Sequence, residues 1–262
     1  MRIKAKKSLG QNFLIDKNII EKIASITEIS NKEILEVGPG TGNLSVSLLK
    51  KKPKKFFAFE KDKNLCSILS NKFKDQVEIR NIDILKTNMD LISKRKLIVF
   101  GNLPYNISTE IICNWIINLK KDPWFDELIL MFQKEVADRI VAKENSSDFG
   151  RLTILCNWRL NIKKIFDISP NCFFPKPKIE SSVLHFTLKK NYDLFQNPKN
   201  LELISRIFFN QKRKMIKNPI KQLFKNYSDI SEKLNLNLNL RPQNLSLKQY
   251  FDIVKEYENL RS

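Results

Sequence analysis

Short apolar runs that end at a polar residue or a glycine recur along the first half of the chain. They are rich in β-branched and aromatic residues, so each predicts a buried strand. These runs are Ile34–Val37, Phe56–Phe59, Val77–Ile82 and Lys96–Phe100. Amphipathic segments lie between them, and Asp16 can cap a helix that begins just after it. The alternation of strands and helices predicts an α/β fold with a mainly parallel sheet.

The second half continues this pattern and then changes. Leu128–Phe132 predicts a fifth strand, and Ile162–Ile168 and Ser181–Lys189 predict two final antiparallel strands joined by a proline-stiffened loop. His185 is expected on the outward face of an edge strand, and we assign it no role. Helical spacing replaces strand alternation after Lys190. We therefore expect two domains, an α/β domain over residues 1–190 and a small all-helical domain over residues 191–262.

The net charge of the chain indicates the class of its binding partner. The chain carries 47 basic and 28 acidic residues, a formal net charge of +19, which favours binding to a polyanion such as nucleic acid. A solvated surface in a lysine-rich protein is the alternative. Ser205–Lys225 contains seven basic residues and no acidic one. The basic positions we expect to bind RNA are Arg206, Arg213, Lys214 and Lys217.

The cysteines and the single histidine argue against a metal site. Cys66, Cys113, Cys156 and Cys172 are widely spaced without a CxxC pair, so we expect reduced cysteines and no bound metal. The basic amino terminus lacks an apolar signal region, and no run is long enough to span a membrane. We expect a soluble cytoplasmic protein that acts as a monomer and has no membrane partner.

The segment EILEVGPGTGNLS, Glu33–Ser45, predicts a ligand site. Gly38, Gly40 and Gly42 let the backbone turn tightly against a ligand after a buried strand. The spacing is GxGxG, whereas a dinucleotide site needs GxGxxG. Glu36 could accept a hydrogen bond from a ligand ammonium group, which a nicotinamide cofactor does not offer. S-adenosylmethionine therefore fits this turn better.

Acidic residues also end the next two predicted strands. Glu60 is placed to accept hydrogen bonds from both ribose hydroxyls, and Asp83 could accept from an adenine amine with Ile84 beside the ring. Each acid alone could be a solvated strand end. Because Glu36, Glu60 and Asp83 recur at three successive strand ends, we expect one cofactor crevice.

The segment GNLPY lies where another buried strand ends. Asn102 could accept from an amine N–H and Tyr105 could stack on a base, with Leu103 and Pro104 shaping the turn between them. The expected target is the exocyclic amine of adenine. An ordinary strand-to-helix turn is the alternative.

Two further segments leave alternatives open. Lys6–Leu14 places Gln11 and Asn12 on an approach to the core, although a simple basic arm would have the same sequence character. In the later loop CFFPKPKIE, either Phe173 or Phe174 could wall a substrate pocket, and core packing is the alternative for both rings.

The motifs SLGQNFL, ILEVGPGTG, FEKD, NIDIL, GNLPYNIS, FQKEVADRI, FGRL, FFPKPKIESSV and FNQKRKMIKN, in this order, resemble the small-subunit ribosomal RNA adenine N6,N6-dimethyltransferases. The resemblance covers nearly the whole chain. It implies a seven-stranded, Rossmann-like methyltransferase domain and a small helical domain. It further implies dimethylation of two adjacent adenosines near the 3′ end of the small-subunit rRNA, late in subunit assembly, with S-adenosylmethionine as cofactor.

The resemblance also implies site residues. Gln11, Asn12, Gly38, Glu60, Asp83 and Asn102 match cofactor-contacting positions of the family, and Phe173 matches the first aromatic of its F-x-P-x-P motif. We add the flanking residues Leu14, Gly40 and Lys61 to the expected cofactor site. A methyltransferase for large-subunit rRNA or DNA adenine and a non-catalytic ribosome assembly factor remain as alternatives.

Overall fold

The computed structural model describes residues 5–6 and 9–261. Lys7 and Ser8 of the predicted basic approach lie outside the described residues. The chain forms two compact units. Unit 1 comprises Met1–Asn114, Leu119–Ala137 and Ile162–Leu188, and unit 2 comprises Trp115–Asn118, Asp138–Asn161 and Lys189–Ser262. Unit 2 thus contains two earlier segments in addition to the predicted residues 191–262.

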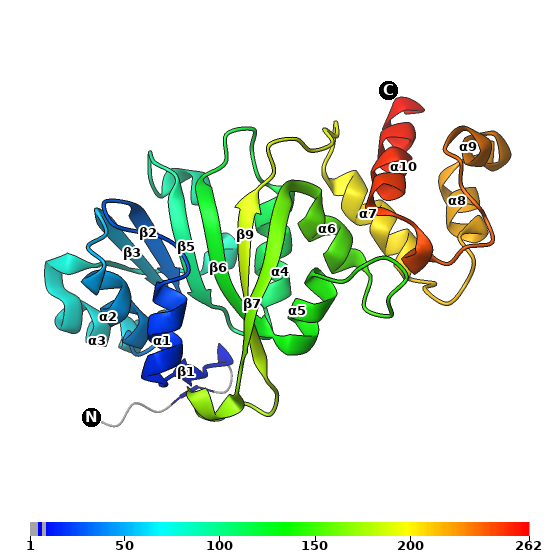
Figure 1. Cartoon of the computed structure of the whole chain (residues 1–262). Helices are drawn as coiled ribbons and strands as arrows, with labels where there is room; N and C mark the ends of the chain where they lie inside the picture. The colour runs from blue at the N-terminus through cyan, green and yellow to red at the C-terminus, as the bar shows by residue number, and fades with distance from the viewer. Residues whose placement is uncertain (1–4, 7–8, 262) are drawn as a thin grey trace. The chain divides into compact units, whose positions relative to one another are not determined.

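Unit 1 is built on a seven-stranded sheet, as expected (Figure 1). The strand order is β4-β3-β2-β5-β6-β9-β7. The strands are β2 (Glu33–Val37), β3 (Lys55–Glu60), β4 (Glu78–Asn81), β5 (Leu97–Asn102), β6 (Phe125–Gln133), β7 (Leu160–Ile168) and β9 (Ser181–Leu188). The first five pair in parallel, whereas β9 is antiparallel to β6. The carboxyl ends of β2, β3 and β5 therefore meet at one edge of the sheet.

The strand β9 lies between β6 and β7. The expectation that His185 occupies an edge strand is therefore wrong. The chain inserts its last strand beside β6 because the apolar residues of β9, including Val183, Leu184 and Phe186, are fully buried there. His185 itself is only partly buried, with Nε2 2.7 Å from Glu127 Oε2 on β6.

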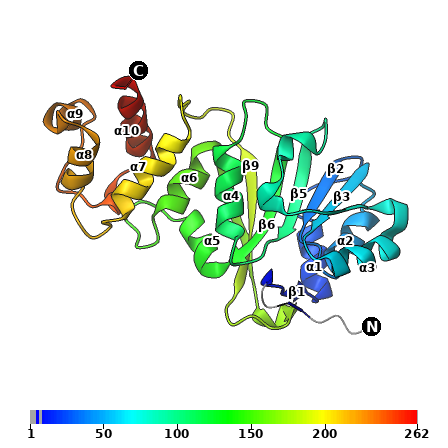
Figure 2. The ribbon, with the colours of Figure 1, turned by 180° about the vertical axis from the view of Figure 1, so that it is seen from behind.

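Helices cover both faces of the sheet in unit 1 (Figures 1 and 2). The helices α1 (Lys17–Ala24), α2 (Asn43–Lys50) and α3 (Lys63–Phe73) share one apolar cluster with β2 and β5. The opposite face carries α4 (Ser108–Ile117). The side chain of Asp16 accepts a hydrogen bond from the Ile19 N–H at 2.9 Å, so it caps α1 as predicted.

Unit 1 also contains a second, very small sheet. The strand β1 (Phe13–Leu14) pairs antiparallel with β8 (Phe173–Phe174). The helix α5 (Lys134–Ile140) follows β6, and between Lys63 and Ser181 the described chain also forms 3-10 turns. These turns are η2 (Lys74–Gln76), η3 (Ile84–Lys86), η4 (Met89–Leu91) and η5 (Pro170–Cys172).

Unit 2 is helical and packs around Tyr250. Its elements are α6 (Arg151–Arg159), α7 (Lys199–Phe209), α8 (Lys217–Leu223), α9 (Tyr227–Lys233), η6 (Pro242–Asn244) and α10 (Leu247–Asn259). Tyr250 is fully buried, its ring lies against Phe208, and its hydroxyl donates to the Pro242 carbonyl at 2.8 Å. The helix α6 belongs to this unit because it packs on α7 and α10.

The pair Asn218 and Pro219 is typical of an N-cap and a first helical position, but α8 begins two residues earlier than this pair predicts, at Lys217. Pro219 is tolerated at the third helical position because the first N–H groups of a helix have no intrahelical acceptor. Ile220 and Leu223 are buried, as their spacing predicts. Among the described residues, no helix combines the length and the apolar character needed to cross a membrane.

Candidate active site at the carboxyl ends of the parallel strands

A cavity opens in unit 1 at the carboxyl ends of β2, β3 and β5. It encloses about 1000 Å³ of space, including some open to solvent. The segment Leu9–Leu14, which we call the amino-terminal arm, forms one wall, and the glycine turn Gly38–Gly42 forms another.

The glycine turn is held in a conformation that other residues rarely adopt. Gly38 and Gly40 have φ angles of 72° and 57°, in the left-handed region that favours glycine. A Cβ at Gly40 would lie 2.7 Å from Cδ1 of Phe13, so only a glycine lets the arm approach this closely. Lys72 Nζ supports the turn by donating to the carbonyl oxygen of Thr41 at 3.0 Å.

Glu36 is a buried acid at this turn, with an exposed fraction of 2%. Its Oε2 accepts a hydrogen bond from Ser45 Oγ at 2.5 Å, and the residue borders the cavity. Burial, reinforced by the negative charge of Glu60, raises the pKa of Glu36 to about 7, although the Ser45 hydrogen bond and the Lys72 charge oppose the shift. A cation bound beside this carboxyl would therefore favour the loss of its proton near neutral pH.

Glu60 ties two backbone turns together at the end of β3. One carboxylate oxygen accepts from the Gly40 N–H at 3.2 Å and the other accepts from the Asp62 N–H at 2.9 Å. Burial raises the pKa of Glu60 against the effect of these hydrogen bonds. Each carboxylate oxygen has a second lone pair, so Glu60 can also accept from ligand hydroxyls in the cavity that it borders.

The third acid is placed differently from the first two. Asp83 pairs with Lys61 Nζ at 2.9 Å and accepts from the Leu85 N–H at 3.1 Å. The Lys61 hydrogen bond lowers the pKa of Asp83 despite partial burial. Lys61 and Leu85 border the cavity, whereas Asp83 and Ile84 lie outside its lining. The carboxylate of Asp83 thus pairs with the lysine that directly follows β3.

The predicted chemical turn, Asn102–Tyr105, lies on the cavity wall at the end of β5. Asn102 Nδ2 donates to the Asn12 carbonyl at 2.8 Å, which leaves Oδ1 as an acceptor. The carbonyl of Pro104 accepts from the Ile107 N–H at 3.1 Å. The structure therefore brings Asn102, Leu103, Pro104 and Tyr105 to the same cavity as Glu36 and Glu60.

Tyr105 has a partner that the sequence did not indicate. Its hydroxyl lies 2.5 Å from Ser181 Oγ at the start of β9. Burial raises the pKa of Tyr105, and the Ser181 hydrogen bond opposes this. The ring orientation is thus fixed from both ends of the side chain, by the backbone at the turn and by the hydroxyl.

Phe173 packs in the core instead of bordering the cavity. It is 3% exposed and lies in the same apolar cluster as Leu14, which it opposes in the β1–β8 pair. Phe174 is 57% exposed. Core packing, and not a place in the pocket wall, is therefore the role that the structure favours for Phe173. Through its pairing with Leu14, Phe173 supports the arm that forms the wall.

The arm is attached to the cavity at several points. Leu14 accepts from Asn43 Nδ2 through its carbonyl oxygen at 2.8 Å. Gln11 borders the cavity, but both ends of its amide are occupied within the protein: Oε1 accepts from the Lys6 N–H at 2.7 Å, and Nε2 donates to Asp62 Oδ2 at 3.1 Å. Sequence reasoning missed Asp62 and Asn43. Asp62 does precede an amphipathic segment, which is a capping signal, but nothing local announces its contacts with the arm.

The four predicted RNA-binding residues all belong to unit 2. Arg206 lies on α7 and Lys217 on α8, while Arg213 and Lys214 lie in the connection between these helices. All four side chains are exposed. In the part of the chain that the structure describes, no group of three or more histidine, cysteine, aspartate and glutamate residues could hold a metal ion.

A glycine turn, two buried acids and an Asn-Leu-Pro-Tyr turn line one cavity. Comparison with known proteins identifies the family to which a chain with this cavity belongs. The family model described as ribosomal RNA adenine dimethylase matches residues 2–259. This chain belongs to the ribosomal RNA adenine dimethylase family. It is similar to the ribosomal RNA small subunit methyltransferase A of Pelagibacter ubique, with 59% identity over 261 residues and 100% of both chains covered.

Other members of the rRNA adenine dimethylase family and solved structures extend the likeness. The ribosomal RNA small subunit methyltransferase A of Ehrlichia ruminantium is 40% identical, with 96% of each chain covered. The crystal structure of a dimethyladenosine transferase from Plasmodium falciparum superposes with a TM-score of 0.81 at 26% identity, covering 94% of this chain and 98% of that one. The 23S rRNA methyltransferase ErmE shares the fold, with a TM-score of 0.67 at 20% identity, 93% of this chain and 99% of that one covered.

Proposed function

We propose that this chain transfers methyl groups from S-adenosylmethionine to N6 of two adjacent adenosines near the 3′ end of the small-subunit rRNA, in late subunit assembly. The observation that carries the proposal is that the Asn102–Tyr105 turn and the acids Glu36 and Glu60 face one cavity. The substrate follows from family membership and from the names of the relatives, which act on small-subunit rRNA.

The donor set of the cavity fits this cofactor. Glu36 is a buried acceptor for an ammonium group, Glu60 has lone pairs for ribose hydroxyls, and Gly38 and Gly40 allow close backbone approach. Asn12, Leu14 and Lys61 border the same space. When bound, S-adenosylmethionine supplies a methyl group that its sulfonium centre activates. The residues of the chain then have to hold the target amine in line with that methyl group.

Asn102 and the backbone at Leu103 orient the adenine amine. The lone pair of N6 is delocalised into the ring, so acceptors for the two N–H bonds have to hold the nitrogen in a geometry that frees it. Asn102 Oδ1 is one acceptor, and the Leu103 carbonyl is the preferred second one because the Pro104 carbonyl has only one lone pair left after accepting from Ile107. Such positioning of two bound reactants can supply about 7–11 kcal/mol.

Tyr105 completes the binding of the base. Its ring can stack on adenine and stabilise positive charge near the transferring methyl group by about 0.5–2 kcal/mol. No strong base is needed, because the nitrogen becomes acidic once it is methylated. After the first transfer one N–H remains, so the second transfer proceeds with one acceptor contact fewer.

The basic residues of unit 2 are the part of the chain expected to bind RNA. We propose that Arg206, Arg213, Lys214 and Lys217 contact rRNA phosphates and leave base recognition to the cavity. The substrate is then a precursor small subunit, and the enzyme acts as a cytoplasmic monomer without a metal.

Transfer of labelled methyl groups to three substrates tests the proposal. Undermethylated small subunits, large subunits and duplex DNA are incubated in parallel with labelled S-adenosylmethionine, and the product nucleosides are identified. N6,N6-dimethyladenosine in small-subunit rRNA alone is the expected result. Label in large subunits or DNA would favour another methyltransferase, and no label in any arm would favour an assembly factor.

A further inference from the structure

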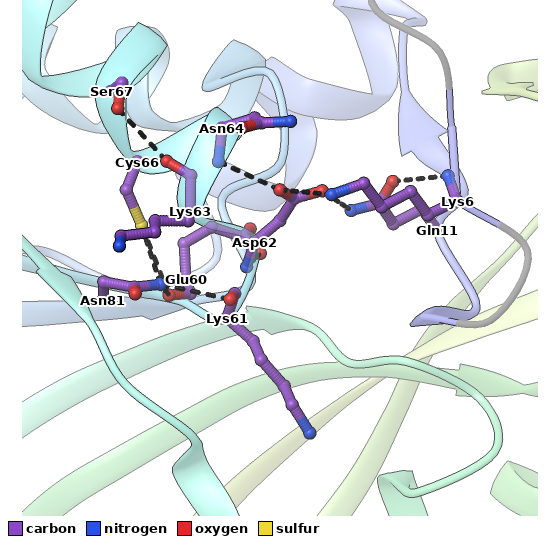
Figure 3. Close-up of polar contacts among 10 residues, drawn as sticks. All are labelled: Lys6, Gln11, Glu60, Lys61, Asp62, Lys63, Asn64, Cys66, Ser67 and Asn81. Carbon is purple, nitrogen blue, oxygen red and sulfur yellow. Dashed lines mark hydrogen bonds and ion pairs between the residues drawn. The ribbon is translucent and has the colours of Figure 1, made fainter.

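Asp62 lies just outside the cavity and gathers three donors on one carboxylate. Oδ1 accepts from Lys6 Nζ at 2.8 Å and from the Asn64 N–H at 3.0 Å, and Oδ2 accepts from Gln11 Nε2 at 3.1 Å. Figure 3 shows Asp62 between Lys6 and Gln11 on one side and the start of α3 on the other. The side chain of Asp62 is 3% exposed, and that of Lys6 is 45% exposed.

This arrangement exceeds what a helix cap requires. An N-cap residue needs one side-chain oxygen to accept from one N–H of the first turn, and the bond from Asn64 already meets that need for α3. The second oxygen and the remaining lone pair of the first face the amino-terminal segment. Burial would raise the pKa of Asp62, but hydrogen bonds from Lys6, Gln11 and Asn64 outweigh it and lower the pKa below its ordinary value.

The arm that these bonds hold is part of the cavity wall. Phe13 packs on Gly40 of the glycine turn, and the Asn12 carbonyl accepts from Asn102 of the chemical turn. Asp62 is also linked to the end of β3, because its N–H donates to Glu60. An arm anchored at Asp62 therefore spans from the proposed ribose acceptor to the proposed amine acceptor.

We propose that Asp62 is a positioning residue that, through Lys6 and Gln11, latches the amino-terminal arm over the cofactor cavity. The inference rests on the proposed function and adds to it a device that sets how long the cofactor stays bound. It also gives Gln11 a structural role beside the proposed cofactor contact, since one N–H of its amide donates to Asp62 and a second N–H remains for the cavity that the residue borders.

The latch acts through the population of the open arm. Each contact that stabilises the closed arm lowers the population of the open arm. If the cofactor leaves only while the arm is open, its dissociation rate falls in the same proportion. The latch should leave the methyl-transfer step itself unchanged at saturating cofactor. Because Lys6 is half exposed, salt should weaken the pair and shorten the residence time of the cofactor.

Two variants remove the latch from its two sides. Lys6→Met removes the ammonium group, and Asp62→Asn removes the charge but keeps an oxygen for Asn64, because asparagine is also a good N-cap. Chase of labelled S-adenosylmethionine should show dissociation faster by up to about fivefold in Lys6→Met, as expected for an ion pair with a half-exposed lysine. Asp62→Asn should reach at least about tenfold, because Gln11 also loses a charged acceptor. KM for the cofactor should rise accordingly, while kcat stays within about twofold.

Matched controls separate the latch from general effects of charge. Lys6→Arg keeps a cation that can reach Asp62 and should retain slow dissociation. Lys63→Gln removes a lysine adjacent to Asp62 whose side chain points away from the carboxylate in Figure 3, so it should behave as wild type. Added salt should speed dissociation from the wild type and have less effect on Lys6→Met.

Hydrogen exchange of the arm in the cofactor-free protein tests the latch independently of the proposed function. Amides of Leu9–Leu14 should exchange faster in Lys6→Met and Asp62→Asn than in wild type. Failure of the wild type to bind S-adenosylmethionine would overturn the proposed function, and faster arm exchange in the variants would still support the anchor. Wild-type arm exchange and wild-type cofactor dissociation in both variants would overturn the latch.

Discussion

Glu36→Gln should make the cofactor-free protein more stable above neutral pH. The wild-type carboxyl has a pKa of about 7 in the folded chain, against an ordinary value of 4.5, because it is buried beside Glu60. Glutamine cannot ionise, and it keeps an oxygen for the hydrogen bond from Ser45. The substitution therefore removes the cost of a buried charge and little else.

The sign and the size of this difference in unfolding free energy follow from proton linkage. Below pH 4.5 Glu36 is protonated in both the folded and the unfolded chain, so its contribution is fully present. As the pH rises to about 7 the unfolded chain releases this proton first, and the stability contributed by the neutral folded form is lost. At about 1.4 kcal/mol per pKa unit, the wild type should lose up to about 3 kcal/mol of unfolding free energy relative to Glu36→Gln.

Urea unfolding of both proteins at about pH 5 and about pH 8, on either side of the folded-state pKa, measures this double difference. Glu21→Gln is a matched control, because Glu21 also accepts from a serine, Ser47 Oγ at 2.7 Å, but is half exposed and has a lowered pKa. Because a lowered pKa contributes stability that is already present above the ordinary value of 4.5, that variant should show little change relative to wild type between these two pH values. An equal stability difference between wild type and Glu36→Gln at the two pH values would refute the account of Glu36.

Three other predictions concern the cofactor, the base and the RNA. Glu60→Ala should weaken S-adenosylmethionine binding by about 1.5–3 kcal/mol through loss of charged hydrogen bonds; unchanged affinity in calorimetry of the folded variant would remove Glu60 from the site. Tyr105→Phe should lower methyl transfer less than Tyr105→Ala, because stacking needs the ring; equal losses for the two variants in single-turnover assays would argue against stacking. Ser181→Ala should match Tyr105→Phe if the contact between the two hydroxyls orients the ring. Neutralising Arg213, Lys214 and Lys217 together should reduce the salt dependence of subunit binding by about two to three phosphate equivalents without changing cofactor affinity; a wild-type slope would make these residues a solvated face.

The parts of the fold that the sequence predicts are those with local signals. Apolar runs placed β2, β3, β5 and β6, Asp16 placed the start of α1, and the glycines at 38, 40 and 42 placed the turn before α2. Asn102 and Tyr105 could be assigned to the cavity because the residues after a buried parallel strand emerge at the ligand-binding edge of such sheets. In each case the structural cause lies within a few residues of its effect.

Contacts between distant segments escaped prediction. The two-residue strands β1 and β8 pair Leu14 with Phe173, which puts Phe173 in the core, and neither strand is long enough to show alternation. The place of β9 between β6 and β7 depends on pairing that periodicity cannot reveal. The ion pair of Asp83 with Lys61 also escaped prediction, because it depends on side-chain reach in three dimensions.

The central claim is that the Asn102–Tyr105 turn orients an adenine amine for methyl transfer. The most direct test is the rate of methyl transfer to undermethylated small subunits by an excess of wild type or Asn102→Ala, with saturating labelled S-adenosylmethionine so that each adenosine can receive two methyl groups, and with the nucleosides identified. We predict N6,N6-dimethyladenosine from the wild type, and at least about 10²-fold slower transfer by Asn102→Ala with cofactor affinity within a few fold. Formation of dimethyladenosine by Asn102→Ala at a near wild-type rate would contradict the account.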